Sequence, residues 1–531
     1  MPLVGALSLA EQYRSAGRLR EAEALCKDIL DVSPRDANAM HLLGLVAYQG
    51  GKLAEAIEHI RRAVALAPNV ASFHANLGEM YRLAGRSDQA VAAGRRALAL
   101  QPEYPEALSN LGIALYDEKE YEEAAQCQRR AIGLKPGFAL AHSNLGNALL
   151  ALKHFDEAAA AHRQAIALDP GFADAWSNLG TTLHHAGHYD EAIAALRRAI
   201  ALAPQHAKAH AGLGILLLMR GEFSKGWEEY DWRLQAAEKR PRFQQRSWQG
   251  ESLAGRHIYV QAEQGFGDTL QFARYLPALK ARAGSVTLRV QGGLRTLMRE
   301  SLPGIEVLGD GGAPARDPDC DCALLSLPRL FKTRLAAIPA TVPYLRPPAE
   351  IAARWGRRLA TMPGLRTGLV WAGSAEHAND FRRSLGLAAL VPVLAVPGVS
   401  FASLQVGPRA ADRKTQPAAK ILDLASRLTD FAETAGAVAA LDLVITVDTA
   451  AAHLAGALGK PVWLLLPWIT DWRWLLGRED SPWYPTMRLY RQRQGEAWQE
   501  VVARVAADLA AVAQGERARL APFQAQAGGH P

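Results

Sequence analysis

Two short segments of this chain place polar side chains directly after an apolar run and at the start of a predicted helix. The segment Glu263–Asp268 contains two glycines and ends on Asp268, whose carboxylate can cap the helix or accept a proton from a nearby hydroxyl. The segment Asp448–His453 follows the apolar run 443–447. Because the first N–H groups of a helix have no partner inside it, this second segment favours a bound phosphate.

The second segment supplies several candidate phosphate contacts, namely Asp448, Thr449, Ala450 and Ala451. Thr449 adds a hydroxyl donor. His453 lies one turn further along the same side of the helix and can donate to an anionic leaving group. The alternative for His453 is a histidine that only packs inside its helix.

Further candidate binding residues follow two other predicted strands. Gly373 and Ser374 end one strand, and Arg382 stands in the loop that follows, where a guanidinium suits phosphate oxygens. A solvated arginine pair is an equally ordinary interpretation. Gln405 ends the next strand, where its amide can read a nucleobase edge. The run Trp472-Arg473-Trp474 shapes a pocket or merely packs.

No metal site is predicted. Asp317, Asp319 and Asp321 alternate like a calcium-binding run, but they lack its glycine and its bidentate glutamate, so we expect a solvated loop. Cys320 and Cys322 are too close together for a zinc site and have no partner pair.

The residues from 256 onward alternate β-rich runs with helical runs, which predicts parallel sheets covered by helices. The predicted strands are 258–262, 286–290, 323–327, 367–371, 400–406, 443–447, 462–466 and 487–490, and the predicted helices are 269–281, 294–301, 430–440, 450–458 and 497–513. A proline-rich break at 339–348 divides the region into two doubly wound halves. Ligands of such halves bind at the carboxyl ends of the strands.

The first half of the chain repeats every 34 residues. Proline recurs at this spacing from Pro34 to Pro204, as do a Leu-Gly pair and two alanine columns. Each unit predicts two amphipathic helices around a glycine or polar turn, such as Gly51, Gly85 and Gly187. The small residues let the helices approach closely, and the proline stops the second helix. This pattern resembles the tetratricopeptide repeat, whose units stack into a curved solenoid.

One column of the repeat is polar, and it consists of Asn76, Asn110, Asn144 and Asn178. These residues lie on the first helix of each unit. An amide both donates and accepts, so the row can hold the backbone of an extended acceptor peptide. The alternative is that each asparagine only satisfies a neighbouring helix.

Length, charge and cysteine content narrow the class of protein. The 531 residues predict two to four domains, and a net charge of +7 without a run of basic residues does not indicate a nucleic-acid partner. Four cysteines and no apolar stretch long enough to span a membrane predict a cytoplasmic protein.

The two polar segments resemble the Gly-Asp loop and the Asp-Thr-Gly-x-x-His element of the heptosyltransferase-like glycosyltransferases of family 9, with Ala450 in place of the glycine. The resemblance implies a GT-B fold of two Rossmann-like halves, with Asp268 as the base and the second element holding the donor phosphate. Together with the repeats, the layout is similar to O-linked N-acetylglucosamine transferase, where a similar asparagine row holds peptide, and to flagellin glycosyltransferases.

We therefore expect an all-α solenoid followed by an α/β GT-B region. The expected limits are 3–235 for the solenoid, 236–255 for a connector, 256–345 and 346–515 for the two halves, and 516–531 for a disordered tail. The expected activity is metal-independent transfer from a nucleotide sugar to a Ser/Thr hydroxyl of a protein, with no cofactor. The alternatives are a scaffold with a decayed transferase, and a transferase that acts on a saccharide or lipid.

Overall fold

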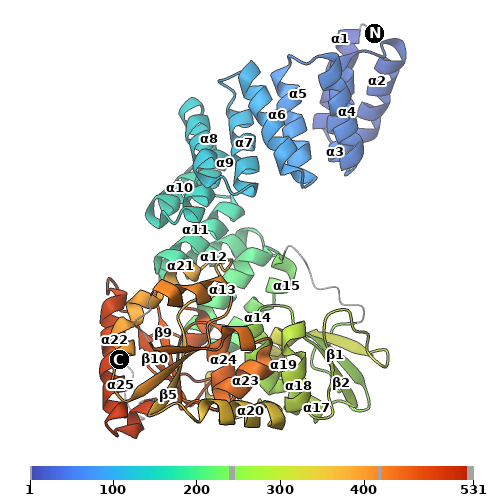
Figure 1. Cartoon of the computed structure of the whole chain (residues 1–531). Coiled ribbons are helices and arrows are strands. Elements are labelled where there is room, and N and C mark those ends of the chain that lie inside the picture. The colour runs from blue at the N-terminus through green and yellow to red at the C-terminus, as the bar shows by residue number, and fades with distance from the viewer. Residues whose placement is uncertain (1–2, 238–245, 416–419, 523–531) are drawn as a thin grey trace. The chain divides into compact units, whose positions relative to one another are not determined.

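The chain folds into two compact units, Met1–Ala209 and His210–Pro531 (Figure 1). The computed structural model describes residues 3–237, 246–415 and 420–522. The predicted domain limits at 235, 255 and 345 stay predictions. Of the predicted disordered tail, Arg517–Leu520 form a short 3-10 helix, and residues 523–531 lie outside the described part.

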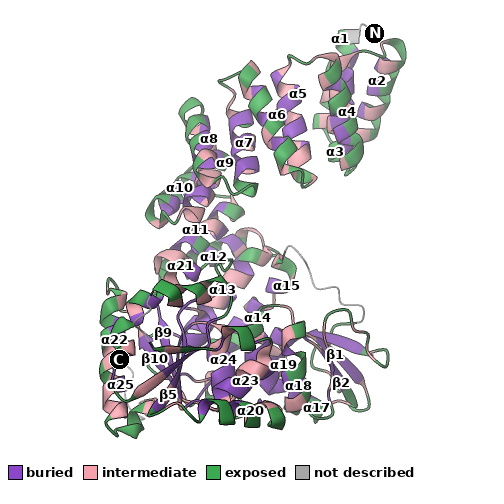
Figure 2. Ribbon diagram, in the orientation of Figure 1, coloured by how far each residue is buried: buried purple, intermediate pink, exposed green. Residues whose placement is uncertain are grey.

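The first unit consists of antiparallel helix pairs with the predicted period. The helices are α1 (Leu3–Ser15), α2 (Leu19–Val32), α3 (Ala37–Gln49), α4 (Leu53–Leu66), α5 (Ala71–Leu83), α6 (Ser87–Leu100), α7 (Pro105–Asp117), α8 (Tyr121–Leu134), α9 (Ala139–Ala151), α10 (Phe155–Leu168), α11 (Ala173–Ala186) and α12 (Tyr189–Leu202). The residues of both alanine columns are buried between the helices, while the outer helix faces are exposed (Figure 2).

Two features of the repeat explain this pairing. The predicted glycine turns at Gly51, Gly85 and Gly187 have positive φ, which glycine adopts without strain. Lys119 and Lys153 take the same conformation in two other repeats. The glycine of the Leu-Gly pair marks a close approach of helices, because a Cβ on Gly180 of α11 would stand 2.5 Å from Leu196 Cγ of α12.

The second unit begins within helix α13 (Ala207–Met219) and continues through α14 (Phe223–Tyr230) and α15 (Arg233–Ala236). A Cβ on Gly214 would stand 2.4 Å from the backbone nitrogen of Tyr230, so this pair is as close as the repeats before it. The aromatic face of α14 is buried, with Trp227 in edge contact with Trp472 and Phe272.

Two parallel sheets form the rest of the second unit. The first has the order β3-β2-β1-β4 and the second β10-β9-β8-β5-β6-β7. The strands are β1 (His257–Gln261), β2 (Ser285–Arg289), β3 (Glu306–Leu308), β4 (Cys320–Ala323), β5 (Leu365–Val370), β6 (Val399–Ser403), β7 (Ile421–Asp423), β8 (Leu443–Val447), β9 (Val462–Leu466) and β10 (Met487–Arg491). In each sheet the strand that comes first in the chain, β1 or β5, lies between the second (β2 or β6) and the fourth (β4 or β8). This is the doubly wound order.

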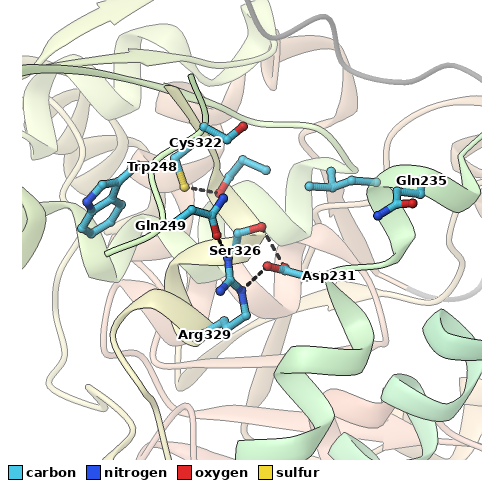
Figure 3. Close-up of a pocket in the computed structure, with 10 residues that line it drawn as sticks. Asp231, Gln235, Trp248, Gln249, Cys322, Ser326 and Arg329 are labelled. Atoms are coloured by element: carbon cyan, nitrogen blue, oxygen red, sulfur yellow. Dashed lines mark hydrogen bonds and ion pairs between the residues drawn. The ribbon is translucent and has the colours of Figure 1, made fainter. Parts of the chain in front are cut away.

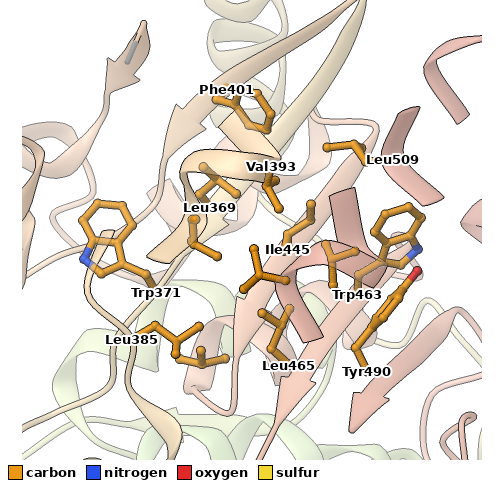
Figure 4. Close-up of a cluster of buried hydrophobic side chains, with 14 of the residues drawn as sticks. Leu369, Trp371, Leu385, Val393, Phe401, Ile445, Trp463, Leu465, Tyr490 and Leu509 are labelled. Atoms are coloured by element: carbon orange, nitrogen blue, oxygen red, sulfur yellow. The ribbon is translucent and has the colours of Figure 1, made fainter. Parts of the chain in front are cut away.

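Helices cover both sheets. The main ones are α16 (Phe266–Phe272), α17 (Leu276–Lys280), α18 (Arg295–Ser301), α19 (Leu327–Leu330), α20 (Ala349–Leu359), α23 (Phe431–Ala439), α24 (Ala450–Ala457) and α25 (Trp498–Ala513). One core cluster joins Leu369 of β5, Ile445 of β8 and Leu465 of β9 to Leu509 of α25 (Figure 4).

The structure corrects part of the predicted α/β region. The fourth strand is Cys320–Ala323, whereas residues 324–326 form a 3-10 turn, so the predicted strand 323–327 was misplaced. Asp321 lies in this strand and is buried, and it accepts a hydrogen bond from Ser247 Oγ at 3.2 Å. The solvated loop predicted for the acidic run is therefore wrong at Asp321. The helix predicted from 269 begins at Phe266 and is interrupted by a 3-10 segment, Ala273–Tyr275.

We predict that Gly180→Ala destabilises α11 and α12, because the new Cβ overlaps Leu196 and lies 3.2 Å from the Ala192 carbonyl. Such overpacking costs about 1–3 kcal/mol. Hydrogen–deuterium exchange of the two helices measures the loss. Gly133→Ala in α8 is the matched control, since its Cβ meets nothing within 4 Å and alanine favours a helix by about 1 kcal/mol. Equal exchange in both variants would contradict the close-approach explanation.

Candidate functional site

The carboxyl ends of the central strands hold the two predicted segments. In the first sheet, the segment Glu263–Asp268 follows β1 next to β4, and in the second sheet Asp448 follows β8 next to β5. These are the points where the strand order reverses, and doubly wound sheets bind their ligands there. The candidate site therefore consists of two such edges within one unit.

The starts of helices α16 and α24 meet at this site. A Cβ on Gly267 of α16 would stand 2.8 Å from Cδ2 of His453 and 3.7 Å from Cα of Ala450. A side chain at position 267 would therefore force the His453 ring or the helix turn to shift. The predicted Asp268 and the predicted His453 thus lie on two helix turns that are in direct contact.

Asp268 has two hydrogen-bond partners that occupy different carboxylate oxygens. The Gly265 N–H donates to Oδ2 at 2.9 Å, which closes the first turn of α16 as the helix-cap interpretation predicts. Arg473 forms an ion pair with Oδ1. Asp268 is therefore both a cap and one end of a salt bridge that joins the first sheet region to the second.

Arg473 is buried and also contacts a second carboxylate. Its Nη1 lies 2.8 Å from Asp471 Oδ1, and its backbone N–H donates to the same oxygen at 2.9 Å. The neighbouring ring of Trp472 lies under the guanidinium, 4.3 Å from Cζ to the ring centroid. From the sequence alone, Arg473 was only one member of an aromatic run and had no predicted role. Its partner Asp268 lies 205 residues away in the chain, so no local pattern links the two residues.

The predicted phosphate contacts lie at the start of α24. Thr449 precedes the helix with φ −144°, and its side chain caps no N–H group. In the described residues, the N–H groups of Ala450 and Ala451 donate to no protein acceptor. The Thr449 hydroxyl lies 3.2 Å from that of Thr446. Free N–H groups and a positive helix end are the features that favour an anion.

Burial changes the charge state of two groups beside this helix start. Burial and the nearby Asp471 carboxylate raise the pKa of Asp448 to about 6. Burial lowers the pKa of His453 to about 3, and Arg473 adds to this by repelling a second positive charge. His453 is therefore a neutral ring at physiological pH, and it stacks on Trp474 with ring centroids 5.2 Å apart.

The segment after β5, which contains the short helix α21 (Asp380–Arg383), brings Arg383, the neighbour of the predicted Arg382, to the switch point. Arg383 Nη1 donates to the Asp448 carbonyl at 2.9 Å, and a Cβ on Gly373 would stand 2.6 Å from its Nη2. Arg382 lies over the ring of Phe381 at 5.1 Å. Ser374 is exposed in the same loop. Sequence alone does not distinguish two adjacent arginines in a loop.

The amide of Gln405 is already used inside the protein. Its Oε1 accepts from the N–H groups of Trp371 and Ala372 at 3.1 and 3.0 Å, and its Nε2 donates to the carbonyls of Ala372 and Val406 at 3.0 and 3.2 Å. These bonds fix the backbone after β5. Base reading by Gln405 stays a prediction, but its side chain has no idle amide atom in the described structure.

Glu263 is a buried residue that sequence reasoning did not select. Its carboxylate pairs with Arg233 of α15 at 2.6 Å and accepts the N–H groups of Leu324 and Leu325 at 3.1 and 3.3 Å. Burial raises the pKa of Glu263. The residue therefore ties the turn after β4 to the helix that precedes the first sheet.

The asparagine column of the first unit is half-buried and partly engaged. Amide nitrogens donate to side chains of the preceding repeat, from Asn76 to His41 at 2.9 Å, from Asn144 to Ser109 at 3.5 Å and from Asn178 to Ser143 at 3.5 Å. In the described part, no protein donor reaches the carboxamide oxygens of the column. The row thus stabilises neighbouring helices and still offers acceptors.

A hollow of about 310 Å³ lies away from the predicted residues, between α15, the residues 247–249, the end of β4 and α19 (Figure 3). Asp231 on its wall accepts from Ser326 Oγ at 2.8 Å and forms an ion pair with Arg329. Asp231, Ser326 and Arg329 on the wall of the hollow therefore satisfy one another.

The described residues contain neither a membrane-spanning helix nor a metal-binding cluster. No described helix has the length and apolar character to cross a membrane. No described cluster of three histidine, cysteine, aspartate or glutamate residues is arranged to hold a metal ion, and metal independence stays a prediction.

We predict that His453→Gln reduces the acid sensitivity of the second unit. An unfolded histidine binds a proton below about pH 6.5, whereas His453 in the folded chain does not until about pH 3. Stability is therefore lost as the pH falls from 6.5 toward 3. Between pH 7 and pH 5 this loss is about 2 kcal/mol, and the variant should escape it.

Urea unfolding followed by tryptophan fluorescence measures this difference, since Trp176 is the one tryptophan before residue 210. The raised pKa of Asp448 acts in the opposite sense and is common to both proteins, so the comparison isolates His453. The control is His257→Gln, which removes another buried histidine of the second unit. Parallel pH profiles of His453→Gln and the unchanged chain would show that His453 titrates normally.

The tetratricopeptide repeat family matches residues 7–71, 60–105, 76–137 and 143–207, and a second tetratricopeptide repeat family matches residues 183–242. The chain is also similar to Protein FlbA of Caulobacter vibrioides, with 30% identity over 321 residues that make up 55% of this chain and 53% of that protein. The chain thus spans about half the length of this curated relative.

Solved structures with a likeness to the chain include three helical proteins. MamA is 26% identical, with 31% of this chain and 97% of that chain covered and a TM-score of 0.28. YrrB, described as a TPR protein with an unusual peptide-binding site, is 23% identical, with coverages of 35% and 95% and a TM-score of 0.30. A tetratricopeptide repeat protein from Parabacteroides merdae is 17% identical, with coverages of 45% and 94% and a TM-score of 0.39. The two family matches show that the N-terminal part of the chain, to about residue 240, consists of tetratricopeptide repeats.

Proposed function

We propose that the second unit transfers a sugar from a nucleotide-sugar donor to a Ser/Thr hydroxyl of a protein, and that the repeats bind this protein. The observation that carries the proposal is the contact between the starts of α16 and α24, where Gly267 lies against His453. It brings a carboxylate and an unoccupied helix start together at the carboxyl edges of two doubly wound sheets. This arrangement supports chemistry between a hydroxyl and a phosphate-bearing donor.

The donor diphosphate would bind at the start of α24. The N–H groups of Ala450 and Ala451 and the Thr449 hydroxyl are its proposed donors, and Arg383 lies close enough to add charge. Negative charge develops on the phosphate oxygen as the sugar leaves, and these groups are oriented before the reaction. Ala450, where the resembling family has glycine, leaves the N–H groups of the helix start in place.

Asp268 would act as the base. As the acceptor oxygen attacks the anomeric carbon, the bond from that carbon to the phosphate oxygen breaks, Asp268 takes the hydroxyl proton, and a nucleoside diphosphate departs. In the structure Asp268 is paired with Arg473. A bound diphosphate would compete for Arg473 and release the carboxylate.

A scaffold without activity is the second candidate, and the ion pair on Asp268 favours it, because this carboxylate is engaged without substrate. Tetratricopeptide repeats typically bind peptide or protein partners. A transferase for a saccharide or lipid acceptor, with repeats that only recruit partners, is a third possibility.

We predict that Asp268→Asn lowers the transfer rate about 10²- to 10⁴-fold, the usual contribution of a general base, while nucleotide binding persists. The asparagine can still accept the Gly265 N–H, so the loop keeps its cap. The readouts are release of nucleoside diphosphate from a panel of nucleotide sugars and thermal shift with the same panel.

Asp310→Asn is the matched control, because Asp310 also accepts a loop N–H, from Gly292 at 3.2 Å, but has no part in the proposed step. Normal turnover of Asp268→Asn would refute the base assignment. No stabilisation of the unchanged chain by any nucleotide or nucleotide sugar would favour the scaffold.

We predict that replacing Asn110, Asn144 and Asn178 with alanine weakens binding of the acceptor protein, because the carboxamide oxygens that would accept its backbone N–H groups are lost. Three lost hydrogen bonds of about 1 kcal/mol each correspond to roughly 100-fold in affinity. Pull-down from the native cell extract with quantitative mass spectrometry measures the loss. Asn69→Ala, in an exposed loop position of the same unit, is the control. Unchanged transfer and capture in the triple variant would favour a saccharide or lipid acceptor.

A further inference from the structure

Tyr484 makes a direct contact with the ring of His453. The Tyr484 hydroxyl lies 3.0 Å from Nδ1 of His453, and both side chains are buried. The Tyr484 ring lies flat on α24, where a Cβ on Gly456 would stand 2.5 Å from its Cδ1. Gly456 therefore creates the space from which the hydroxyl reaches back one turn to His453.

The neighbours of the Tyr484 hydroxyl decide the direction of this hydrogen bond. Arg274 offers only donors. The Tyr344 hydroxyl already accepts from Arg274 at 3.0 Å and donates to the Leu270 carbonyl at 2.9 Å. The Tyr344 oxygen also lies beside the Tyr484 hydroxyl, but the acceptor at a hydrogen-bond distance from that hydroxyl in the described structure is Nδ1 of His453, at 3.0 Å. A neutral imidazole that accepts at Nδ1 carries its proton on Nε2.

The other ring nitrogen faces the start of α16. Nε2 of His453 lies 3.5 Å from the place a Cβ on Gly267 would occupy. Among the described residues, Nε2 has no hydrogen-bond partner. It is also not one of the fully buried polar atoms that lack a partner, so it is accessible to solvent. An Nε2–H group therefore points toward the part of the site where α16 and α24 meet.

Arg274 holds Tyr484 in place. Its guanidinium lies 4.7 Å from the centre of the Tyr484 ring, and its Nη1 donates to the Trp483 carbonyl at 2.7 Å. In the described part of the chain Arg274 has no carboxylate partner, so carbonyls and aromatic faces stabilise its charge. A buried cation bound in this way fixes the backbone and ring of the tyrosine at the same time.

The geometry points to Tyr484 as a positioning residue that keeps His453 in the Nε2–H tautomer, so that the ring offers one N–H to an oxygen of the donor diphosphate. The identity of that ligand rests on the proposed function. The tautomer itself does not, because it follows from the contacts of the ligand-free chain.

The first test is ¹⁵N NMR of histidine-labelled full-length protein, with the His453 signals assigned from their loss in His453→Gln. We expect a protonated Nε2 and an unprotonated Nδ1 in the unchanged chain, and a mixture of tautomers in Tyr484→Phe. Tyr490→Phe is the matched control, since it removes a buried hydroxyl bound to Asp508 at 2.8 Å in the same sheet region. A protonated Nδ1 in the unchanged chain would overturn the proposal even if Tyr484→Phe does not fold.

The second test is a double-variant comparison of affinity for UDP, GDP, ADP and dTDP. Tyr484→Phe should weaken the best-bound nucleotide about 2- to 10-fold, the effect of one hydrogen bond. In the background of His453→Gln, whose amide keeps an N–H without the ring, the same change should have no effect. An equal loss in both backgrounds would mean that Tyr484 acts on stability alone and would overturn the proposal. If the tautomer is as expected but no nucleotide binds, the proposed function fails while the role of Tyr484 in setting the tautomer stands.

Discussion

The absence of a side chain at Gly267 is the constraint on which the candidate site depends. The imidazole edge of His453 fills the volume that a Cβ would take, so the first turns of α16 and α24 touch. A larger residue at position 267 would require the His453 ring or one of the two turns to shift, and the ring lies beside Asp268 and the N–H groups of Ala450 and Ala451. The close approach of the two helix starts therefore depends on the glycine at this position.

Charge balance around this contact comes from few groups. Arg473 binds Asp268 and Asp471, and Arg383 reaches the backbone of Asp448. A buried arginine keeps its charge, and His453 is held in its neutral form by burial first and by the nearby charge of Arg473 second. Arg473 is already paired with the carboxylates of Asp268 and Asp471. An anion that binds at the site must therefore replace one of these ion pairs.

The sequence was most informative where a pattern is repeated or fully buried. The 34-residue period and the buried alanine columns are confirmed in the helix pairs, and β8 and β9 have the predicted bounds because they are apolar runs that end in turn residues. Strands of three residues, β3 and β7, carry too little pattern to be predicted. The site motifs were recognised, but their partners were not. Arg473 and Tyr484 act across the fold, on Asp268 and His453, and no local spacing reveals such a contact.

The proposed donor site lies at the start of α24 beside Asp268, in the second unit. A crystal structure of the full chain with a nucleoside diphosphate would test this site. We expect phosphate oxygens within hydrogen-bond distance of the Ala450 and Ala451 N–H groups and of His453 Nε2, with Arg473 turned from Asp268 toward the ligand. A nucleotide bound elsewhere, with the pair between Asp268 and Arg473 intact, would contradict it.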